Sequence, residues 1–545
     1  MLFLLIYYFL VISVLFIIGY SVMNLIGIDS SKNKYIIETS VLIGLSSLTL
    51  FSSVLSIFLP INSFALIGIV IFSLIISKSI PFGNIINVYT QTKVRISYVV
   101  LFLILILLIS SQMISIADTG IHHAQTIQWI RKFGLVPGLA NLQPQIGFNS
   151  AFFLAQAVFV IDIKDFMQGY DLLVYPLNGV LLLLLLSRLL LTSFDVHAEW
   201  ILRIFCISVF SLCLLLLPRW ANSASPDMAI AIISIFLFYF LLQSTAQDYR
   251  IPIIIIACVL TYKLSAAMLG LLLLYYLYIS NSKQKFILFG LVTLCLFFLP
   301  YFYRNYILSG YLVFPLYQID LFNPDWKYPL EAARFEYSVV KSWARISSIN
   351  PYKMLEMPMV EWVPVWFKGK DLIEKFLLFS TIMLLPLFTK AIIRKNFKMV
   401  FISISILFNF LFWFWGAPDP RFAFGIFFVN IGLFLTSFST LISIKLKGIV
   451  INFMLIVAFT SSIFYNRGQI IKSYKRPKTF LIPDSFMDKE YINSKTNFDL
   501  KISRMNLKLP CNNTDLPCSS RTSTGFDNIY LRDSLLSNGF KVVTK

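Results

Sequence analysis

The chain is organised as long apolar runs separated by short polar segments. Runs such as VVLFLILILLIS from Val99 and LLLLLLSRLLL from Leu181 are continuous. A strand of a membrane barrel would instead alternate apolar and polar positions, so the runs predict helices. A spanning helix needs about twenty apolar residues. We therefore predict about fourteen spanning helices, over residues 2–24, 36–59, 61–77, 97–116, 168–191, 201–217, 228–244, 251–262, 264–279, 286–301, 372–389, 399–415, 422–441 and 448–465.

Composition supports a protein embedded in a lipid bilayer. Hydrophobic residues make up 58% of the 545 residues and charged residues only 13%, against about 25% charged residues in soluble proteins. The mean hydropathy is +0.80. Lipid must solvate so apolar a surface, and backbone groups in lipid must be hydrogen-bonded within the protein. The predicted fold class is an all-α, polytopic transmembrane helical bundle.

The net charge of +19 comes from basic residues scattered between the apolar runs. They do not form one patch with interleaved aromatic residues, so we predict that the protein does not bind nucleic acid. Alternate loops carry most of them, including Lys78, Arg203, Lys390 and Lys445. By the positive-inside rule these loops face the cytoplasm. We expect a multi-pass protein of the bacterial cytoplasmic membrane, with its active face and both termini periplasmic or extracellular.

Three polar regions fall on the predicted outer face. We predict a transmembrane domain over 1–465 with outer loops 117–167 and 302–371, and a small C-terminal extracytoplasmic domain over 466–545. The tail contains Cys511 and Cys518 in LPCNNTDLPCSSR. Two nearby thiols in an oxidising compartment favour a disulfide. Free thiols or a zinc site are less favoured, because zinc would need two more ligands nearby.

The sequence SIADTGIHH, which starts at Ser115, leads into the first outer loop and holds two of the chain's three histidines. A carboxylate where a helix leaves the membrane is costly unless it is paired or used. Asp118 can act as a general base toward a hydroxyl, or it can cap the helix that follows. His122 and His123 are candidate substrate-binding residues. A metal bound by Asp118, His122 and Asp227 would lack a close ligand cluster, so we predict no cofactor, with a divalent metal as the less favoured alternative.

Five more charged residues lie at predicted outer helix ends. Asp227 can bind a sugar hydroxyl, or it can belong to a Ser-Pro-Asp sequence that begins a helix. Lys263 and Arg304 can hold a phosphate or extend harmlessly to the membrane interface. In WGAPDPRF, two prolines make a rigid turn that carries Asp419 and Arg421. Arg421 can bind a phosphate there, or the two residues can form a purely structural pair.

These residues resemble the GT-C glycosyltransferases, which are polytopic enzymes that use polyprenyl-phosphate-linked sugars. The likeness rests on ADTGIHHA from Ala117, an outer loop with an aspartate after an early helix. The segments SGYLVFP from Ser309, DWKYP from Asp325 and APDPRF from Ala417 are similar to a bacterial branch of largely uncharacterised membrane proteins. Asp118 lacks the second acidic neighbour of many members, and more predicted helices precede its loop than the one that is usual.

The resemblance implies a membrane glycosyltransferase that moves a sugar from a polyprenyl-phosphate-linked donor to a glycan or lipid acceptor. Asp118 would deprotonate the acceptor hydroxyl in one inverting step, while cations stabilise the leaving phosphate. By residue type, Lys263, Arg304 and Arg421 are the phosphate candidates. A lipid-linked oligosaccharide flippase or transporter is the main alternative, although its ionisable groups would lie near the bilayer midplane. An O-antigen polymerase or ligase would share the same lipids.

Overall fold

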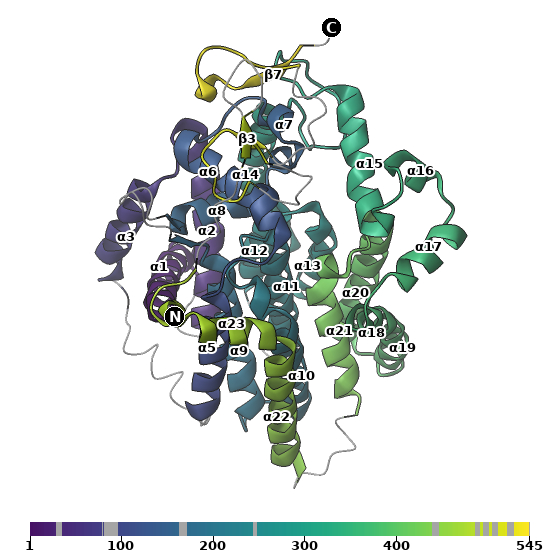
Figure 1. The fold of residues 1–545 in the computed structure, drawn as a ribbon. Helices are drawn as coiled ribbons and strands as arrows, with labels where there is room; N and C mark the ends of the chain where they lie inside the picture. The colour runs from purple at the N-terminus through teal and green to yellow at the C-terminus, as the bar shows by residue number, and fades with distance from the viewer. Residues whose placement is uncertain are drawn as a thin grey trace.

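Apolar helices form a bundle, with the predicted outer loops gathered at one end (Figure 1). The computed structural model describes residues 1–28, 35–78, 80, 96–162, 172–243, 248–438, 446–484, 491–493, 501–503, 511–519 and 528–543. The bundle consists of α1 (Leu2–Leu25), α2 (Ile36–Phe58), α3 (Ser63–Ser77), α5 (Ile96–Ser110), α9 (Leu177–Phe194), α10 (Trp200–Leu216), α11 (Pro226–Leu242), α12 (Arg250–Leu260), η6 (Leu264–Leu271), α13 (Leu272–Ile279), α14 (Lys283–Ser309), α18 (Leu372–Ser380), η7 (Thr381–Met383), α19 (Leu384–Ile393), α20 (Phe397–Gly416), η8 (Pro420–Ala423), α21 (Phe424–Thr436) and α22 (Lys447–Tyr465).

The polar regions add short helices and strands. Their helices are η2 (Thr119–His123), α6 (Ala124–Phe133), α7 (Leu139–Leu142), η3 (Pro144–Phe148), α8 (Phe152–Phe159), η5 (Pro218–Trp220), α15 (Leu330–Ile346), α16 (Pro351–Glu356), α17 (Met359–Lys368), α23 (Arg467–Lys475), η11 (Pro477–Phe480) and η13 (Leu536–Asn538). Antiparallel pairs join β1 (Ile161–Asp162) to β2 (Leu173–Val174) and β6 (Ile529–Leu531) to β7 (Phe540–Val542). In the tail, β4 (Lys501–Ser503) pairs antiparallel with β3 (Tyr491–Asn493) and parallel with β5 (Cys518–Ser519).

Seven helices in the described part of the chain are long and apolar enough to cross a membrane. They are α1, α2, α9, α14, the continuous segment Leu372–Ile393, α20 and α22. Seven shorter apolar helices of 10–17 residues occupy the other predicted segments. An apolar helix is therefore present at every predicted position. The number that cross the bilayer stays a prediction.

Several predicted boundaries are wrong: the helix predicted over 97–116 ends at Ser110, and two larger differences adjoin the outer loops. The helix predicted over 168–191 begins only at Leu177, because Pro176 stands at its N-terminal cap after strand β2; residues 163–171 lie outside the described residues. The outer loop predicted over 302–371 begins only after Ser309, because α14 continues through Pro300. The helix α14 ends before Gly310, whose φ of +82° is a conformation that glycine adopts without strain.

Close backbone contact holds the first two helices together. A Cβ atom on Gly19 would lie 1.8 Å from the carbonyl oxygen of Ser40, and one on Gly44 would lie 1.9 Å from that of Leu15. Small residues allow apolar helices to approach this closely and so gain dispersion contacts along their length. Near the centre, every residue of α11 from Pro226 to Leu241 is buried.

Loops predicted on the same side of the membrane contact one another. At the end predicted to be cytoplasmic, Arg250 donates to the carbonyl of Ile26, and Lys398 Nζ donates to the carbonyl of Gln243 at 2.9 Å. The loops predicted to be outside meet at the other end, as described below. This packing agrees with the prediction that successive loops lie at opposite ends of the bundle. Which end faces the cytoplasm stays a prediction.

The described part of the tail packs on the rest of the protein. Ile529 and Phe540 share a small hydrophobic cluster with residues of the first outer loop, among them Trp129 and Leu139. The rings of Trp129 and Phe540 meet edge to face at 5.8 Å. The boundary predicted at residue 465 coincides with the end of α22 at Tyr465. Beyond it, the strands β6 and β7 are held by the first outer loop.

Candidate functional site

Asp118 stands where the chain turns from the extended segment after α5 into η2. Its side chain makes no hydrogen bond to the helix N-terminus. The capping role that its sequence position allowed is therefore absent, and the carboxylate points elsewhere. Its Oδ2 accepts a 2.7 Å hydrogen bond from Nη1 of Arg421, a residue 303 positions away in the sequence. The Asp118 side chain is 24% exposed.

Arg421 is held by the proline-bounded turn between α20 and α21. The carboxylate of Asp419 accepts a hydrogen bond from the Arg421 backbone N–H at 3.1 Å and so caps η8. Its other oxygen lies 3.3 Å from the guanidinium Nε, which makes an ion pair without a hydrogen bond. Trp413 donates its indole N–H to the Asp419 carbonyl at 2.7 Å. The short turn thus places one cation between Asp118 and Asp419.

A second ion pair lies beside the first. Asp227, in the first turn of α11, accepts a 2.6 Å hydrogen bond from Nζ of Lys263, which lies between α12 and η6. The same Nζ lies 3.4 Å from the ring centroid of Phe422, and the Arg421 guanidinium carbon lies 4.9 Å from it. Cations are attracted to aromatic faces, so this ring joins the two pairs. We call Asp118, Asp227, Lys263, Asp419 and Arg421 the charged cluster.

Burial and charge set the protonation of the groups around Asp118. Burial raises the pKa of Asp118, but Arg421, His122 and Lys263 outweigh it and leave that pKa below its ordinary value. Burial lowers the pKa of His122 to about 4, with Lys263 and Arg421 lowering it further and Asp118 opposing them. Burial and the neighbouring His122 also hold the pKa of His123 well below its ordinary value. At neutral pH Asp118 is therefore ionised, and the two imidazoles beside it are neutral.

Comparison with known proteins shows the family of the chain. A family model described as "Domain of unknown function (DUF8201)" matches residues 1–428. The chain belongs to this family. The matched region contains the whole charged cluster and both histidines, and it ends before α22 and the tail. No curated protein matches the chain, and no solved structure matches it.

Seven of the eight predicted catalytic or substrate-binding residues come together in this region, and Arg304 does not. Because α14 continues past residue 301, Arg304 lies inside the helix and is only 3% exposed. Its guanidinium donates to Asn149 Oδ1 at 3.1 Å and to the Ser56 hydroxyl. Two of its donors therefore join three helical segments, and the contact of Arg304 with a lipid phosphate stays a prediction.

The second outer loop reaches the charged cluster through Trp343 and Trp366, two of the aromatic residues that suit this loop either to a carbohydrate-binding cleft or to the membrane interface. The guanidinium carbon of Arg421 lies 5.1 Å from the ring of Trp343 in α15. Trp366 in α17 donates its indole N–H to the Pro418 carbonyl at 3.1 Å. The only sequence signal for these contacts was the general richness of this loop in aromatic residues. Within the described part of the chain, no group of three His, Cys, Asp or Glu side chains is arranged as a metal site.

The tail contacts η2 and the start of α6. Cys511 and Cys518 form a disulfide, and the loop that they close is seated on the first outer loop. The Asn512 N–H donates to the Gly120 carbonyl at 2.8 Å. Gln125 Nε2 donates to the carbonyls of Thr514 at 2.9 Å and Asn512 at 3.1 Å. The disulfide loop is therefore part of the wall that holds the Asp118 segment.

The buried state of His122 can be tested by NMR of labelled histidine. The chain has only three histidines, so single substitutions assign their signals. Because the pKa of His122 is about 4, its imidazole should stay neutral throughout the range around pH 6.5 in which an unperturbed histidine titrates. A chemical-shift midpoint near pH 6.5 for His122 would contradict the burial described above.

Removing the disulfide should loosen the tail over η2. A disulfide that closes a loop this short stabilises the folded state by about 2–3 kcal/mol, because it lowers the conformational entropy of the unfolded segment. We therefore expect C511S/C518S to speed amide exchange across residues 511–519 by tenfold or more. Exchange is measured by mass spectrometry, with C295S as the control because Cys295 is an exposed free thiol. Unchanged exchange would mean that the contacts with Gln125 and Gly120 hold the loop unaided.

Proposed function

We propose that the protein is a membrane glycosyltransferase that acts at the outer face of the bacterial cytoplasmic membrane. It would transfer a sugar from a polyprenyl-phosphate-linked donor to a hydroxyl of a glycan or lipid acceptor. The observation that carries the proposal is the contact of Asp118 with Arg421 beside the Asp227–Lys263 pair. Four separate segments at the ends of apolar helices supply these charges, and Asp118 stays partly exposed.

The geometry of Asp118 supports a role as the base. Arg421 engages Oδ2, and no hydrogen bond to Oδ1 is present among the residues that the structure describes. An acceptor hydroxyl can therefore donate to Oδ1. As the hydroxyl oxygen bonds to the anomeric carbon, its proton passes to Oδ1, and the bond from that carbon to the phosphate oxygen breaks. The phosphate leaves with the bonding electrons, and one such displacement inverts the anomeric centre.

Lys263 and Arg421 are the cations nearest to this reaction. Both are already paired with carboxylates, so their charges are partly compensated before a donor arrives. In this proposal they hold Asp118 and Asp227 in place and add a positive field for the developing phosphate charge. Asp227 and Asp419 are the remaining carboxylates for sugar hydroxyls. The neutral His122 can exchange a hydrogen bond with substrate, because its buried Nδ1 has no partner in the described structure.

Arg421 also sets how basic Asp118 is, which gives a test by pH. In R421Q the main cause of the lowered Asp118 pKa is lost and burial remains, so that pKa should rise. A base with a raised pKa loses its charge at a higher pH. The transfer rate of R421Q should therefore begin to fall at a higher pH than that of the wild type as the solution is acidified. Superimposable pH–rate profiles would argue against Asp118 as the base.

The positions of the charges favour a transferase over a flippase. Each residue of the charged cluster lies at or beyond a helix end, whereas transporters place ionisable groups near the bilayer midplane. The deciding experiment reconstitutes the protein in proteoliposomes with a lipid-linked sugar and an acceptor. We expect a new glycosidic bond. Movement of the donor across the bilayer without bond formation would favour the flippase, and a product extended by repeat units would favour a polymerase or ligase.

A further inference from the structure

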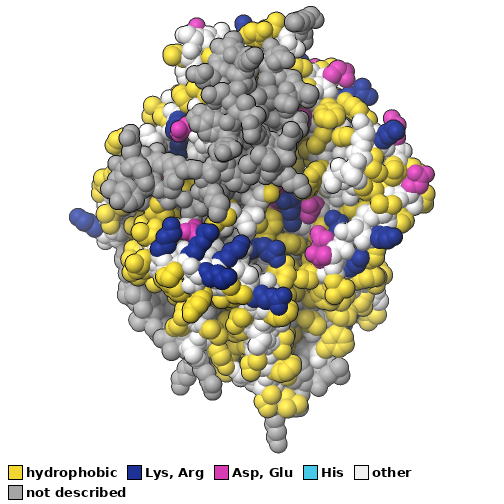
Figure 2. All heavy atoms as spheres, in the orientation of Figure 1, with side chains coloured by type: hydrophobic (Ala, Val, Ile, Leu, Met, Phe, Trp, Pro, Cys, Tyr) yellow, Lys and Arg dark blue, Asp and Glu magenta, His cyan; other side chains and the backbone are white. Residues whose placement is uncertain are grey.

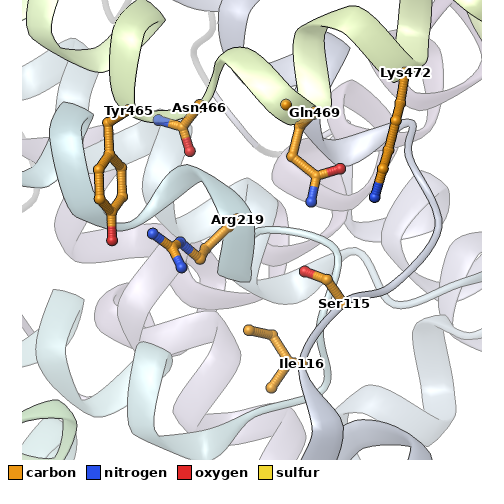
Figure 3. Close-up of a pocket in the computed structure, with 8 residues that line it drawn as sticks. Ser115, Ile116, Arg219, Tyr465, Asn466, Gln469 and Lys472 are labelled. Carbon is orange, nitrogen blue, oxygen red and sulfur yellow. The ribbon is translucent and has the colours of Figure 1, made fainter.

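A cavity of about 350 Å³ lies between α23 and the segment that leads to Asp118. Its lining comes from the end of α22, from α23, from η5 and from the extended chain after α5. The lining residues are Ser115, Ile116, Arg219, Tyr465, Asn466, Gly468, Gln469 and Lys472. Figure 3 shows Gln469 and Lys472 pointing from α23 toward Arg219 and Ser115. The charged cluster contributes no side chain to this lining.

Hydrogen bonds hold the walls of the cavity in place. Gln112, just beyond α5, donates to the Ser473 hydroxyl at 2.6 Å and thereby fixes α23. The Gln112 carbonyl accepts from Asn222 at 2.6 Å, which fixes the chain that follows Arg219. At the corner between α22 and α23, Asn466 donates to the Leu215 carbonyl of α10 at 3.3 Å. The walls of the cavity are therefore held in place by the fold itself.

The polar groups that face the cavity are mostly donors, and the lining contains no carboxylate. Arg219 stacks on the ring of Tyr465 at 4.4 Å. Its guanidinium has no ion pair or hydrogen bond within the described residues, and the same holds for the Lys472 ammonium. Stacking holds the guanidinium plane while leaving its N–H donors available. Two cations without a carboxylate partner in one cavity are arranged to bind an anion.

The surroundings of the cavity indicate that its ligand is a lipid. Exposed apolar side chains flank the lining residues on α22 and α23, namely Phe464, Ile471 and Tyr474. Figure 2 shows Lys and Arg gathered across the middle of this face within a largely apolar surface, at the height at which Figure 1 places α23. A helix with basic and apolar side chains that lies across spanning helices is typical of the membrane interface.

We propose that this cavity binds the phosphate group of an anionic membrane lipid. Arg219 donates in a fork to two phosphate oxygens, Lys472 supplies a point charge, and the Gln469 amide completes the contacts. The acyl chains lie outside the cavity along Phe464 and Ile471. Basic pockets between membrane helices bind lipid headgroups by this chemistry. The inference does not depend on the function proposed for Asp118, although a lipid phosphate held here lies beside the segment that carries that residue.

Binding of defined lipids to the purified full-length protein tests this inference. Native mass spectrometry in a mild detergent measures the dissociation constants of phosphatidylglycerol and of the zwitterionic phosphatidylcholine. We expect the wild type to prefer phosphatidylglycerol by about tenfold or more, and R219Q/K472Q to lose that preference. The matched control is R467Q/K475Q, which also removes two positive charges, both from exposed residues of α23 that do not line the cavity. It should keep the preference.

Three outcomes would overturn the inference. Equal binding of both lipids by the wild type would show that the cavity does not select an anion. An equal loss in R219Q/K472Q and R467Q/K475Q would mean that the charge of the whole helix, and not the cavity, attracts the lipid. Full displacement of the lipid by millimolar inorganic phosphate would assign the cavity to free phosphate. R219K, which keeps the charge and loses the fork, should retain an intermediate preference and shows that the fold tolerates substitution.

Discussion

Replacing Asp118 by Asn should lower the rate of sugar transfer by about 10²–10⁴-fold, the usual contribution of a positioned general base. Asparagine keeps the size of the side chain and can still accept the hydrogen bond from Arg421, so the turn that holds Arg421 should persist. What is lost is the ability to take a proton from the acceptor. The measurement is product formed from a lipid-linked donor by protein in proteoliposomes, with surface glycan of the producing cell as a second readout.

The matched control for D118N is D320N. Asp320 also belongs to an ion pair on the predicted outer face, with Lys327, but it lies outside the charged cluster. We expect D320N to transfer sugar at close to the wild-type rate. The amount of each variant in the membrane must be equal for the comparison to hold. Normal transfer by D118N at a normal protein level would remove Asp118 from the mechanism and leave its ion pair with Arg421 as a structural contact.

The positions of the apolar helices, though not all of their ends, were predicted from the sequence because two signals agree. An apolar run stops where the chain can no longer bury its backbone in lipid, and charged residues collect at that point. The short segments ADTGIHHA and APDPRF stood out for this reason, and both lie in the site. The sequence could not show that Asp118 meets Arg421. The pair joins residues 303 positions apart, and a single sequence carries no record of which distant segments touch.

The wrong predictions have local causes. The helix predicted over 286–301 ended too early, because a proline inside a helix, here Pro300, can be tolerated when neighbours satisfy the freed backbone group. The helix therefore runs on to Ser309 and turns Arg304 into a buried link to Asn149. The contacts of the tail with Gly120 and Gln125 were equally hidden, because they use backbone carbonyls that every residue possesses.

Inside the bundle, Arg188 makes another contact that the sequence alone could not show. Its substitution has the largest expected effect on stability. Arg188 lies in the run LLLLLLSRLLL, where the positive-inside rule counts it among the charges of the cytoplasmic side. The structure buries it in α9, where its Nε donates to Oε1 of Glu38 in α2 at 2.7 Å. The side chains are only 9% and 2% exposed. The guanidinium carbon also lies 5.1 Å from the ring of Tyr35.

Removing either charge of this pair should destabilise the protein by about 3–5 kcal/mol, because the remaining buried charge loses its ion-pair partner. The double variant E38M/R188M should lose much less, since a buried ion pair repays little more than the cost of desolvating its two charges. The free energy of unfolding in detergent, measured for E38M, R188M and E38M/R188M, gives the coupling energy. D325N serves as the control, because its pair with Arg532 is exposed and should contribute about 1 kcal/mol or less. If E38M and R188M simply add in the double variant, the two side chains act independently, and α2 and α9 are held together by their apolar surfaces alone.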